Sequence, residues 1–280
     1  MVYYVDGQFV DADSAVIPLS DLGVIRGYGV FDFTRTYNRE LFCLDEHIAR
    51  LFRSAAMIDL EIPWSHEEIA DVVRETLARN PQLSEAYMRI VITGGDGLDS
   101  VTPADRPRLV VIISPAAPPS DETYQNGAKV ITVRDQRYLP TAKTLNYIPA
   151  IRAMKLANKA DALEAIYVDP QGHVLEGTTT NIFAFFGDTL ITPNDSVLDG
   201  ITRAVVLDLT KDVFDVQQRV LTLNDLYNAD EVFITSSHKQ VMPVVQVDDR
   251  TISTGIPGKR TQRIMALFAQ HAGVIGMTHG

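Results

Sequence analysis

Alternating apolar and polar residues predict a sheet in the first half of the chain. Two sets of side chains alternate over residues 28–37, with Phe31, Phe33 and Arg35 on one face and Asp32, Thr34 and Thr36 on the other. This period of two is typical of a half-buried strand. Residues 86–93 follow the same pattern, which places Tyr87 and Arg89 on one face. Residues 109–113 are wholly apolar, so we expect a strand that is covered on both faces.

A helical period appears between and after these strands. Asp45 can cap a first helix, whose apolar stripe is formed by Ile48, Leu51, Phe52, Ala55 and Ile58. A second helix is expected to begin at Ser65, because Glu68 completes a capping box. Further helices are predicted at about residues 202–214 and 261–271.

A proline-rich stretch at residues 114–121 is expected to end the first sheet and to form a linker. We therefore predict a small N-terminal domain over 1–114, a linker over 115–124 and a larger, β-rich C-terminal domain over 125–280. Turn residues in the second half predict a meander of antiparallel strands over 165–169, 174–186 and 189–192. The expected fold class is α+β with two domains.

Composition narrows the possible partners. The 280-residue chain is 46% hydrophobic and 22% charged, as in an ordinary globular protein. Its net charge of −11 argues against general binding to nucleic acid or to an anionic membrane. No apolar run reaches the ~18–20 residues of a membrane span, and the first residues lack a secretory pattern. We therefore expect a cytoplasmic protein with no nucleic-acid or membrane partner.

Several common chemistries find no support in the sequence. The single cysteine, Cys43, excludes an intrachain disulfide and a cysteine-based zinc cluster. The six histidines lack the spacing of metal ligands, so no metal site is expected. The chain also has no Walker loop, no G-x-S-x-G motif and no H-E-x-x-H motif.

Three segments carry residues that suit one cofactor. Lys143 begins a segment that ends at Tyr147, and Glu176 lies on a predicted strand just before Gly177. Residues 200–202 join a strand to a helix, so their N–H groups either bind a phosphate or simply cap the helix. Taken singly, Lys143 is more simply a solvated lysine and Glu176 a sheet-edge carboxylate. Together they supply an amine, a carboxylate and a phosphate cup, which pyridoxal phosphate requires.

The order and spacing of these segments resemble those of class IV aminotransferases, which have pyridoxal-phosphate fold type IV. The resemblance extends over nearly the whole chain and includes residues 47–51, 143–147, 176–183, 200–203, 229–233 and 243–244. It implies that Lys143 forms the Schiff base with pyridoxal phosphate, that Tyr147 hydrogen-bonds its phenolic oxygen and that Glu176 pairs with its pyridinium nitrogen. It implies further cofactor contacts from Arg50, Asn181, Ile201, Thr202, Ser236 and Ser237. Arg53, one turn from Arg50, is the alternative phosphate-binding arginine.

Segments outside the cofactor motifs bear on the substrate. Arg26 with the Gly-Tyr-Gly that follows it, together with Arg89, resembles D-amino-acid transaminases that use a pair of arginines. The chain departs from branched-chain enzymes at Arg26 and at residues 31–33, and from Bacillus-type D-amino-acid enzymes at residues 94–100, which contain neither arginine nor histidine. The expected substrate contacts are Arg26, Phe31, Tyr87, Arg89, Thr178 and His238.

The strand pattern gives a separate argument for Arg89. It stands between apolar residues, where a partly buried guanidinium needs an anion. A substrate carboxylate, bound bidentately, would supply that anion. A structural ion pair, for example with Asp32, is the alternative.

The sequence therefore predicts a transaminase that moves an amino group from a D-amino acid, such as D-glutamate or D-alanine, to 2-oxoglutarate or pyruvate. Lys143 is expected to move the proton between the substrate α-carbon and the cofactor C4′. A homodimer is expected, with residues of the neighbouring subunit in each site. The alternatives are an L-branched-chain aminotransferase, an (R)-amine transaminase, an aminodeoxychorismate lyase and a non-enzymatic phosphate-binding or interaction protein.

Overall fold

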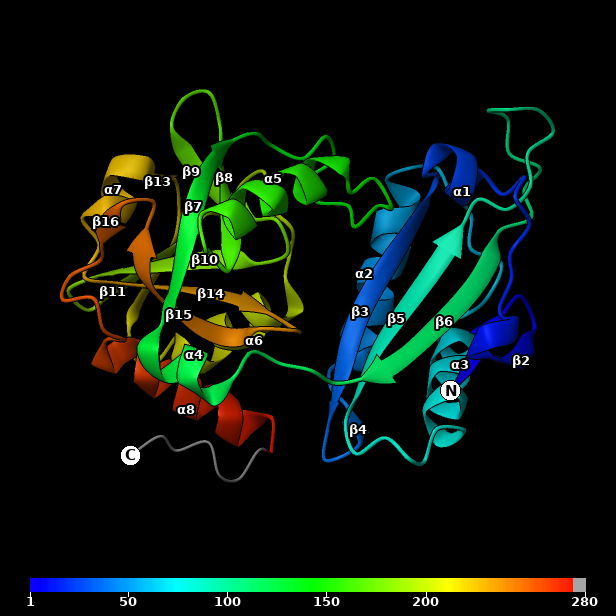
Figure 1. Ribbon diagram of the computed structural model, residues 1–280, viewed down its shortest axis with the longest axis horizontal. Helices are drawn as coiled ribbons and strands as arrows, with labels where there is room; N and C mark the ends of the chain where they lie inside the picture. Colours follow the sequence, from blue (N-terminus) through cyan, green and yellow to red (C-terminus); the bar gives the residue numbers. More distant parts are fainter. Residues whose placement is uncertain (274–280) are drawn as a thin grey trace. The chain divides into compact units, whose positions relative to one another are not determined.

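The computed structural model describes residues 1–273 and divides into two compact units (Figure 1). Unit 1 comprises residues 1–117 and 142–147, and unit 2 comprises residues 118–141 and the chain from 148 onward. The sequence predicts Lys143 in the C-terminal domain, whereas the structure groups it with unit 1. Within the described residues, no helix combines the length and the apolar character that a membrane crossing requires.

Unit 1 is built on a six-stranded sheet in the order β2-β1-β6-β5-β3-β4. Its strands are β1 (Val2–Val5), β2 (Gln8–Asp11), β3 (Gly29–Tyr37), β4 (Glu40–Leu41), β5 (Ala86–Thr93) and β6 (Arg108–Pro115). Neighbouring strands are antiparallel. The register of β3 and β5 pairs Phe33 with Arg89, so both side chains lie on the same face of the sheet.

Helices cover the other face of this sheet. Unit 1 contains the 3-10 turn η1 (Ala12–Ser14) and the helices α1 (Leu22–Arg26), α2 (Leu44–Ala56) and α3 (His66–Ala78). Figure 1 shows α2 and α3 against the sheet, where Ile48, Leu51, Ile69 and Val73 join Met88, Ile90 and Val111 in the core. The Ser65–Glu68 capping box is confirmed. The predicted Asp45 cap is wrong, because α2 already begins after Cys43, whose left-handed φ of 51° turns the chain there.

Strand β6 corrects two expectations. Its apolar residues alternate between buried and half-buried positions, so Val110 and Ile112 are not covered as the sequence predicts. The reason is that α2 and α3 pack on the face that carries Val111 and Ile113. The strand also continues into the predicted linker and ends at Pro115, a position where a sheet tolerates proline.

Unit 2 contains a second, ten-stranded sheet, ordered β12-β11-β10-β14-β15-β7-β8-β9-β13 with β16 beside β15. Its strands are β7 (Ala128–Arg134), β8 (Glu164–Val168), β9 (His173–Gly177), β10 (Asn181–Phe186), β11 (Thr189–Thr192), β12 (Asp215–Gln218), β13 (Leu221–Thr222), β14 (Glu231–Ser236), β15 (Gln240–Val247) and β16 (Arg250–Thr251). The predicted meander is confirmed in its antiparallel pairs β8–β9 and β10–β11, but residues 178–180 interrupt the expected strand 174–186. As a result β9 pairs with β8 and β13, whereas β10 pairs with β11 and β14.

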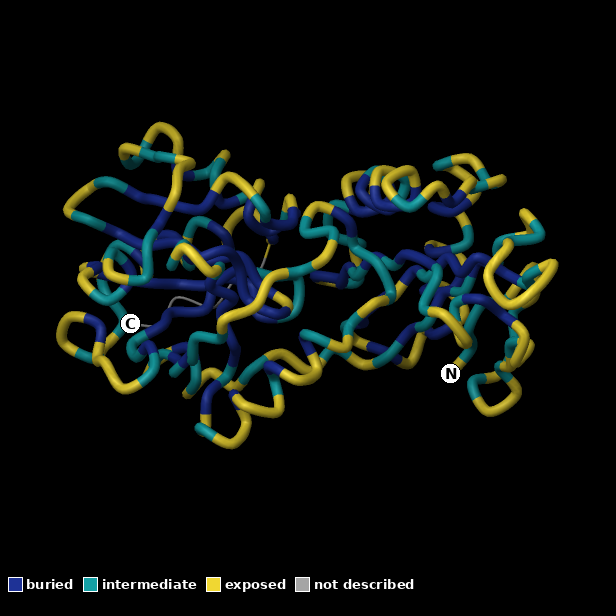
Figure 2. The backbone as a smooth tube through the Cα atoms, turned by 90° about the horizontal axis from the view of Figure 1, so that it is seen from above, coloured by how far each residue is buried: buried dark blue, intermediate teal, exposed yellow. Residues whose placement is uncertain are grey.

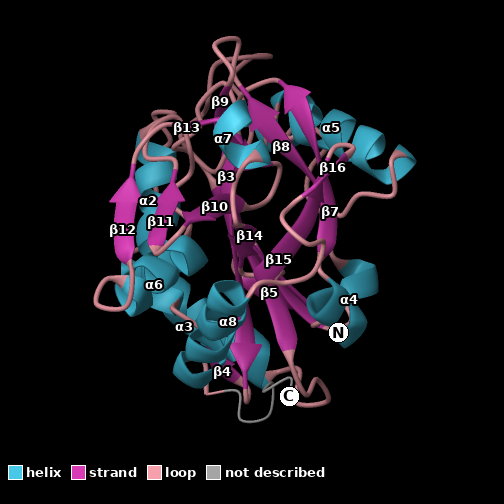
Figure 3. Ribbon diagram, turned by 90° about the vertical axis from the view of Figure 1, so that its left-hand side faces the viewer, coloured by secondary structure: helices cyan, strands magenta, loops and turns pink. Residues whose placement is uncertain are grey.

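The helices of unit 2 are α4 (Asp121–Asn126), α5 (Ile148–Lys159), α6 (Ile201–Thr210), α7 (Leu223–Tyr227) and α8 (Lys259–His271). Helix α4 lies in the predicted linker, where Ser120 caps it. Helix α5 packs on β7 and β8, and α6 packs against α8 beside β14 (Figure 3). Figure 2 shows that buried residues gather in the interior of each unit, while exposed residues lie on its outside. The mixture of helices and sheets confirms the predicted α+β class.

Candidate active site

Backbone hydrogen bonds fix Lys143 on unit 1. Its N–H donates to the Ser54 hydroxyl oxygen at 3.0 Å, and its carbonyl accepts from the Phe31 N–H at 3.0 Å. Two residues later, the Leu145 N–H donates to the carbonyl of Gly29 at 3.0 Å. Residues 142–147 therefore run alongside β3, and hydrogen bonds hold the backbone from which the Lys143 side chain extends.

The Lys143 side chain lies on the aromatic face of the sheet. Its Nζ is 4.6 Å from the centroid of the Phe31 ring, which meets Tyr147 edge to face at 5.3 Å. Alternation along β3 and β5 places Phe31 on the same face as Tyr87 and Arg89. Unit 1 thus brings the predicted Schiff-base lysine together with predicted cofactor and substrate contacts.

The surroundings of Arg89 differ from those expected. Its side chain is exposed, its Cζ lies 5.9 Å from the Phe33 ring centroid, and no carboxylate of residues 1–273 forms an ion pair with it. Asp32, the alternative partner, is bonded to Arg50 instead. The prediction of a partly buried Arg89 is therefore wrong. The structure has an exposed guanidinium on an aromatic face of the sheet, with no ion pair among the described residues.

Arg26 is exposed at the end of α1, where its Nε donates to the Ser100 carbonyl at 2.8 Å. The chain reaches β3 three residues later, at Gly29, which pairs with Thr93. Arg89 lies four residues back along β5, which is ~13 Å at ~3.3 Å per residue. Unit 1 therefore does not place the two predicted substrate arginines at adjacent positions of its sheet.

A buried carboxylate organises α2 against β3. Arg50 donates from Nε to Asp32 Oδ2 at 2.8 Å and from Nη2 to Oδ1 at 2.7 Å. The Nδ1 of His47 lies 2.6 Å from Oδ1, and the Phe33 N–H donates to the same oxygen at 2.7 Å. Asp32 is 0% exposed and Arg50 5%, whereas Arg53, the alternative phosphate arginine, is exposed. The pairing of Asp32 with Arg50 was not predicted from the sequence.

Burial and neighbouring charges set the protonation states of Asp32 and His47. Burial alone would raise the pKa of Asp32, but the neighbouring Arg50 and His47 outweigh it, so the pKa lies well below its ordinary value. Burial lowers the pKa of His47, against the opposing effect of Asp32. A neutral His47 donates its Nδ1 proton to Asp32, and its buried Nε2 has no hydrogen-bond partner among the described residues.

In unit 2 the Glu176 carboxylate is held by a cation, Arg137. In unit 1, by contrast, the Asp32 carboxylate holds the cation Arg50. Arg137 Nη1 donates to Oε1 at 3.1 Å, and the Leu198 N–H donates to Oε2 at 2.9 Å. Glu176 is 4% exposed, which excludes the sheet-edge carboxylate in water. Arg137 also donates to the Pro140 carbonyl at 2.9 Å. Its role was not visible in the sequence, because 39 residues separate it from Glu176.

The start of α6 suits a phosphate. Gly200 occupies the N-cap without a side-chain hydrogen bond, and the first turn carries no acidic residue. A Cβ on Gly200 would lie 2.0 Å from the Asn181 Oδ1, so a side chain does not fit there. Asn181 donates to the Leu198 carbonyl at 2.8 Å and thereby holds the loop that leads into the helix. The N–H groups that begin at Ile201 are thus presented in a fixed orientation.

The predicted contacts Thr178 and Ser236 have structural bonds of their own. Thr178 donates its hydroxyl to Glu164, which also accepts from Thr179 at 2.8 Å and from Lys239 Nζ at 3.2 Å. The Lys239 N–H donates to the Ser236 hydroxyl oxygen at 3.0 Å. Burial alone would raise the pKa of Glu164, but Lys239 and the threonines outweigh it and lower the pKa. Ser237 and His238 are half buried in the turn between β14 and β15.

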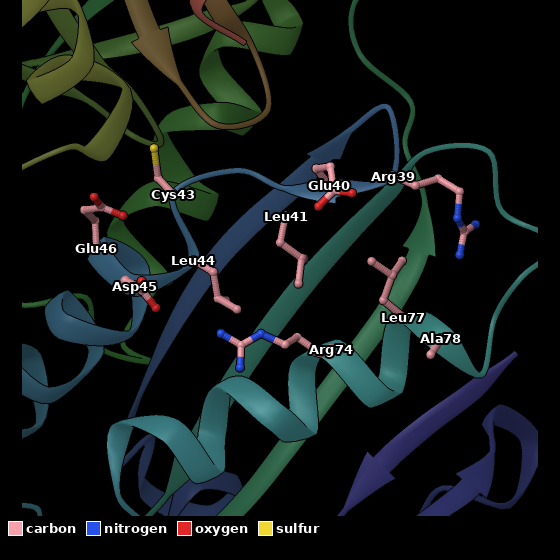
Figure 4. Close-up of a pocket in the computed structure, with 10 residues that line it drawn as sticks. All are labelled: Arg39, Glu40, Leu41, Cys43, Leu44, Asp45, Glu46, Arg74, Leu77 and Ala78. Atoms are coloured by element: carbon pink, nitrogen blue, oxygen red, sulfur yellow. The ribbon is translucent and has the colours of Figure 1, made fainter. Parts of the chain in front are cut away.

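A groove of about 510 Å³ in unit 1 has a lining of its own. Figure 4 shows that charged side chains line it, among them Arg39, Glu40, Asp45, Glu46 and Arg74. It contains no residue of the predicted site. Its acidic and basic groups are mixed, so we assign it no ligand.

Comparison with known proteins places this geometry in context. Residues 29–247 match the family model described as amino-transferase class IV. The chain is 39% identical to a candidate branched-chain-amino-acid aminotransferase of Methanocaldococcus jannaschii, over 96% of this chain and 95% of the relative. It is 33% identical to a D-alanine aminotransferase of Bacillus licheniformis, over 92% and 93%. The branched-chain amino acid aminotransferase of T.th., solved with pyridoxamine 5'-phosphate, superimposes with a TM-score of 0.91 at 29% identity, over 98% of this chain and 94% of that one.

Proposed function

The chain belongs to the amino-transferase class IV family, and we propose that it transfers the amino group of a D-amino acid, of the glutamate or alanine type, to 2-oxoglutarate or pyruvate. The predicted family, its fold type IV architecture and its cofactor, pyridoxal phosphate, are confirmed. Enzymes of this family act on amino acids and 2-oxo acids. When bound, pyridoxal phosphate supplies an electron sink and carries the amino group between the two substrates.

Lys143 is the proposed catalytic residue. Its amine would hold the cofactor aldehyde and, once released, would move the proton between the substrate α-carbon and the cofactor C4′. Its hydrogen bonds with Ser54 and Phe31 support this role, because they fix the backbone from which the side chain extends. The Phe31 ring, 4.6 Å from the Lys143 Nζ, lies beside the amine itself.

Glu176 is proposed to hold the pyridine nitrogen protonated. Its two oxygens already accept from Arg137 and from the Leu198 N–H, so the carboxylate is oriented before any cofactor binds. A carboxylate oxygen accepts more than one hydrogen bond, which leaves capacity for the pyridinium N–H. The proposed contact of Tyr147 with the phenolic oxygen of the cofactor is supported by its packing on Phe31 beside Lys143.

The residues present fit the cofactor phosphate. The unobstructed start of α6, with Ile201 and Thr202, offers backbone N–H groups, and Arg50 offers a full charge. Ser236 and Ser237 are the further proposed contacts, with Asn181 holding the loop before α6. The burial of Arg50 and the exposure of Arg53 support Arg50 as the phosphate arginine.

The observation that supports the substrate class is the position of Arg89 on the sheet face that also carries Phe31, beside the Lys143 amine. In a chain with a net charge of −11, neither Arg26 nor Arg89 forms an ion pair with a carboxylate of the described residues, so none of those acids competes with a substrate carboxylate. Phe31 and Tyr87 would flank that substrate on the face of Arg89, with Thr178 and His238 as the proposed contacts from unit 2.

The proposed assembly is a homodimer, in which the neighbouring subunit contributes residues to each site. We propose such a dimer, without a nucleic-acid or membrane partner and located in the cytoplasm.

The second candidate is an L-branched-chain aminotransferase. It is favoured by the candidate branched-chain enzyme at 39% identity and by the structural neighbour with a TM-score of 0.91. Activity toward (R)-amines and aminodeoxychorismate lyase activity are further alternatives that would share the proposed cofactor residues.

The deciding experiment compares substrates of opposite configuration. The cofactor-loaded protein is assayed with D-glutamate, D-alanine and L-leucine, each with 2-oxoglutarate or pyruvate. We expect D-amino acids to give the higher kcat/KM, whereas a preference for L-leucine would establish the branched-chain alternative. The Lys143→Ala variant should lose both turnover and the yellow colour of the bound cofactor, while Lys155→Ala, an exposed lysine on α5, should keep both.

Replacement of Arg26 and Arg89 tests whether these residues bind the substrate carboxylates. Arg26→Leu and Arg89→Leu should each raise the KM for D-glutamate strongly and leave that for an (R)-arylalkylamine, which lacks a carboxylate, nearly unchanged. Arg152→Leu, an exposed arginine on α5, serves as the control. A parallel loss with both substrates would contradict the arginine-pair assignment.

A further inference from the structure

The Asp32 carboxylate contacts Arg50 along one edge of its guanidinium group. The Nε and Nη2 atoms donate to the two carboxylate oxygens at 2.8 and 2.7 Å. A guanidinium is planar and carries five N–H groups, so this pairing turns its opposite edge away from Asp32. We propose that Asp32 is a positioning residue that holds Arg50 in the orientation in which it binds the cofactor phosphate. The proposal rests on the phosphate-binding role proposed above for Arg50.

Asp32 is itself held by groups that do not depend on a ligand. The His47 Nδ1 and the Phe33 N–H both contact Oδ1, at 2.6 and 2.7 Å. His47 and Arg50 lie one turn apart on α2, while Asp32 belongs to β3. The orientation of Arg50 is therefore tied to the sheet as well as to its own helix.

This arrangement favours binding through preorganisation. An arginine side chain loses much rotamer freedom when it is ordered, and that loss reduces affinity if it occurs on binding. In this chain folding has already ordered Arg50. A buried arginine with no carboxylate would also be strongly unfavourable before a phosphate arrives. Asp32 removes both obstacles, because it orders the Arg50 side chain and gives the buried guanidinium an opposite charge.

Asp32 offsets part of the positive charge of Arg50, but this does not cancel the attraction for phosphate. A phosphate monoester carries close to two negative charges near neutral pH, and the opposite edge of the guanidinium donates in a direction that matches two oxygens. The α6 N-terminus adds dipoles that Asp32 does not affect. Loss of Asp32 should therefore weaken phosphate binding without abolishing it.

The test compares pyridoxal phosphate with pyridoxal, which has the same aldehyde and ring but no phosphate. Dissociation constants are measured on the full-length protein freed of cofactor. Both ligands react with Lys143, so the covalent contribution cancels in their ratio. In Asp32→Asn the dissociation constant for pyridoxal phosphate should rise about tenfold to a hundredfold, while that for pyridoxal should change less than about twofold.

Two variants make this result specific. Asp21→Asn is the matched control, because Asp21 is also 0% exposed in unit 1 and pairs with an arginine, Arg108, that has no proposed cofactor role. It should leave the ratio of the two constants unchanged. Asp32→Glu keeps the charge but moves the carboxylate, and should lower the preference for the phosphorylated ligand by a smaller factor. If Asp32→Asn does not fold, Asp32→Glu decides on the same criterion.

A parallel rise for both ligands, or no change in the ratio, would show that Asp32 has only a structural role and overturn the proposal. Wild-type protein that does not prefer pyridoxal phosphate over pyridoxal would instead refute the phosphate site itself. The two failures are therefore distinguishable.

Discussion

In unit 1 the carboxylate of Asp32 orients an arginine, whereas in unit 2 the arginine Arg137 orients the carboxylate of Glu176. Unit 2 contains a further buried acid, Glu164, whose contacts with Lys239 and three threonines join the 178–180 turn to the turn after β14. Similar buried carboxylates thus serve different ends. In the roles proposed above, Asp32 directs Arg50 toward the cofactor phosphate and Arg137 directs Glu176 toward the pyridinium nitrogen. Glu164 instead holds two turns together.

The largest expected effect separates Glu164 from the other two acids. Glu164→Gln leaves the charge of Lys239 buried without its partner, which should lower the free energy of unfolding by about 3–5 kcal/mol. The double variant Glu164→Gln with Lys239→Met should recover most of this loss. Chemical denaturation measures both. Glu75→Gln, in an exposed pair with Arg79, should cost under ~1 kcal/mol. An equally small loss of unfolding free energy in Glu164→Gln would show that this buried pair stabilises the fold no more than an exposed one.

Glu176→Gln should act on turnover rather than on folding. A neutral amide does not hold the pyridine nitrogen protonated, so kcat should fall by about 10²–10³. Steady-state kinetics and a denaturation curve on the same preparation measure the two effects. Turnover at the wild-type level would assign the pyridinium contact to another residue and remove Glu176 from the comparison.

Arg137 should show a smaller version of the same effect, because it acts through Glu176. Arg137→Ala removes one charge-assisted hydrogen bond, and we expect kcat to fall about tenfold to a hundredfold. Arg137→Lys should restore part of the rate, and the KM for the amino acid should change little. Arg134→Ala, an exposed arginine on β7, is the control. A loss of stability with unchanged kcat would make Arg137 structural.

The smallest expected effect is a pH dependence in unit 1. His47 has a folded-state pKa below its ordinary 6.5, so the unfolded chain binds the proton more readily. Its contribution to stability is complete above pH 6.5 and is lost as the pH falls below that value. His47→Gln should reduce the slope of the unfolding free energy in this range. An unchanged slope in His47→Gln would show that His47 does not titrate as described.

Local features of the fold were readable in the sequence, and distant pairings were not. The Ser65–Glu68 capping box lies within one turn, so the sequence predicts it correctly. The strand predicted over 174–186 fails because Glu164, a residue from another strand, accepts hydrogen bonds from the turn that divides it. The partners of Asp32 and Glu176 were missed for the same reason. Spacing in the chain indicates Lys143 and Glu176 as cofactor residues, but it contains no information about which arginine orients which acid.

The placement of residues 142–147 affects how the protein is made. Unit 1 includes this short segment, although residues 118–141 of unit 2 precede it in the chain. The ribosome adds about 5–20 residues each second and releases the chain from its N-terminus, so the first 117 residues emerge well before the segment that carries Lys143. Unit 1 must therefore wait for part of unit 2 to be synthesised before β3 receives its last partner. A nascent chain arrested at residue 117 should lack the Phe31 and Leu145 hydrogen bonds, and amide exchange at Phe31 should slow only after residue 147 has left the tunnel.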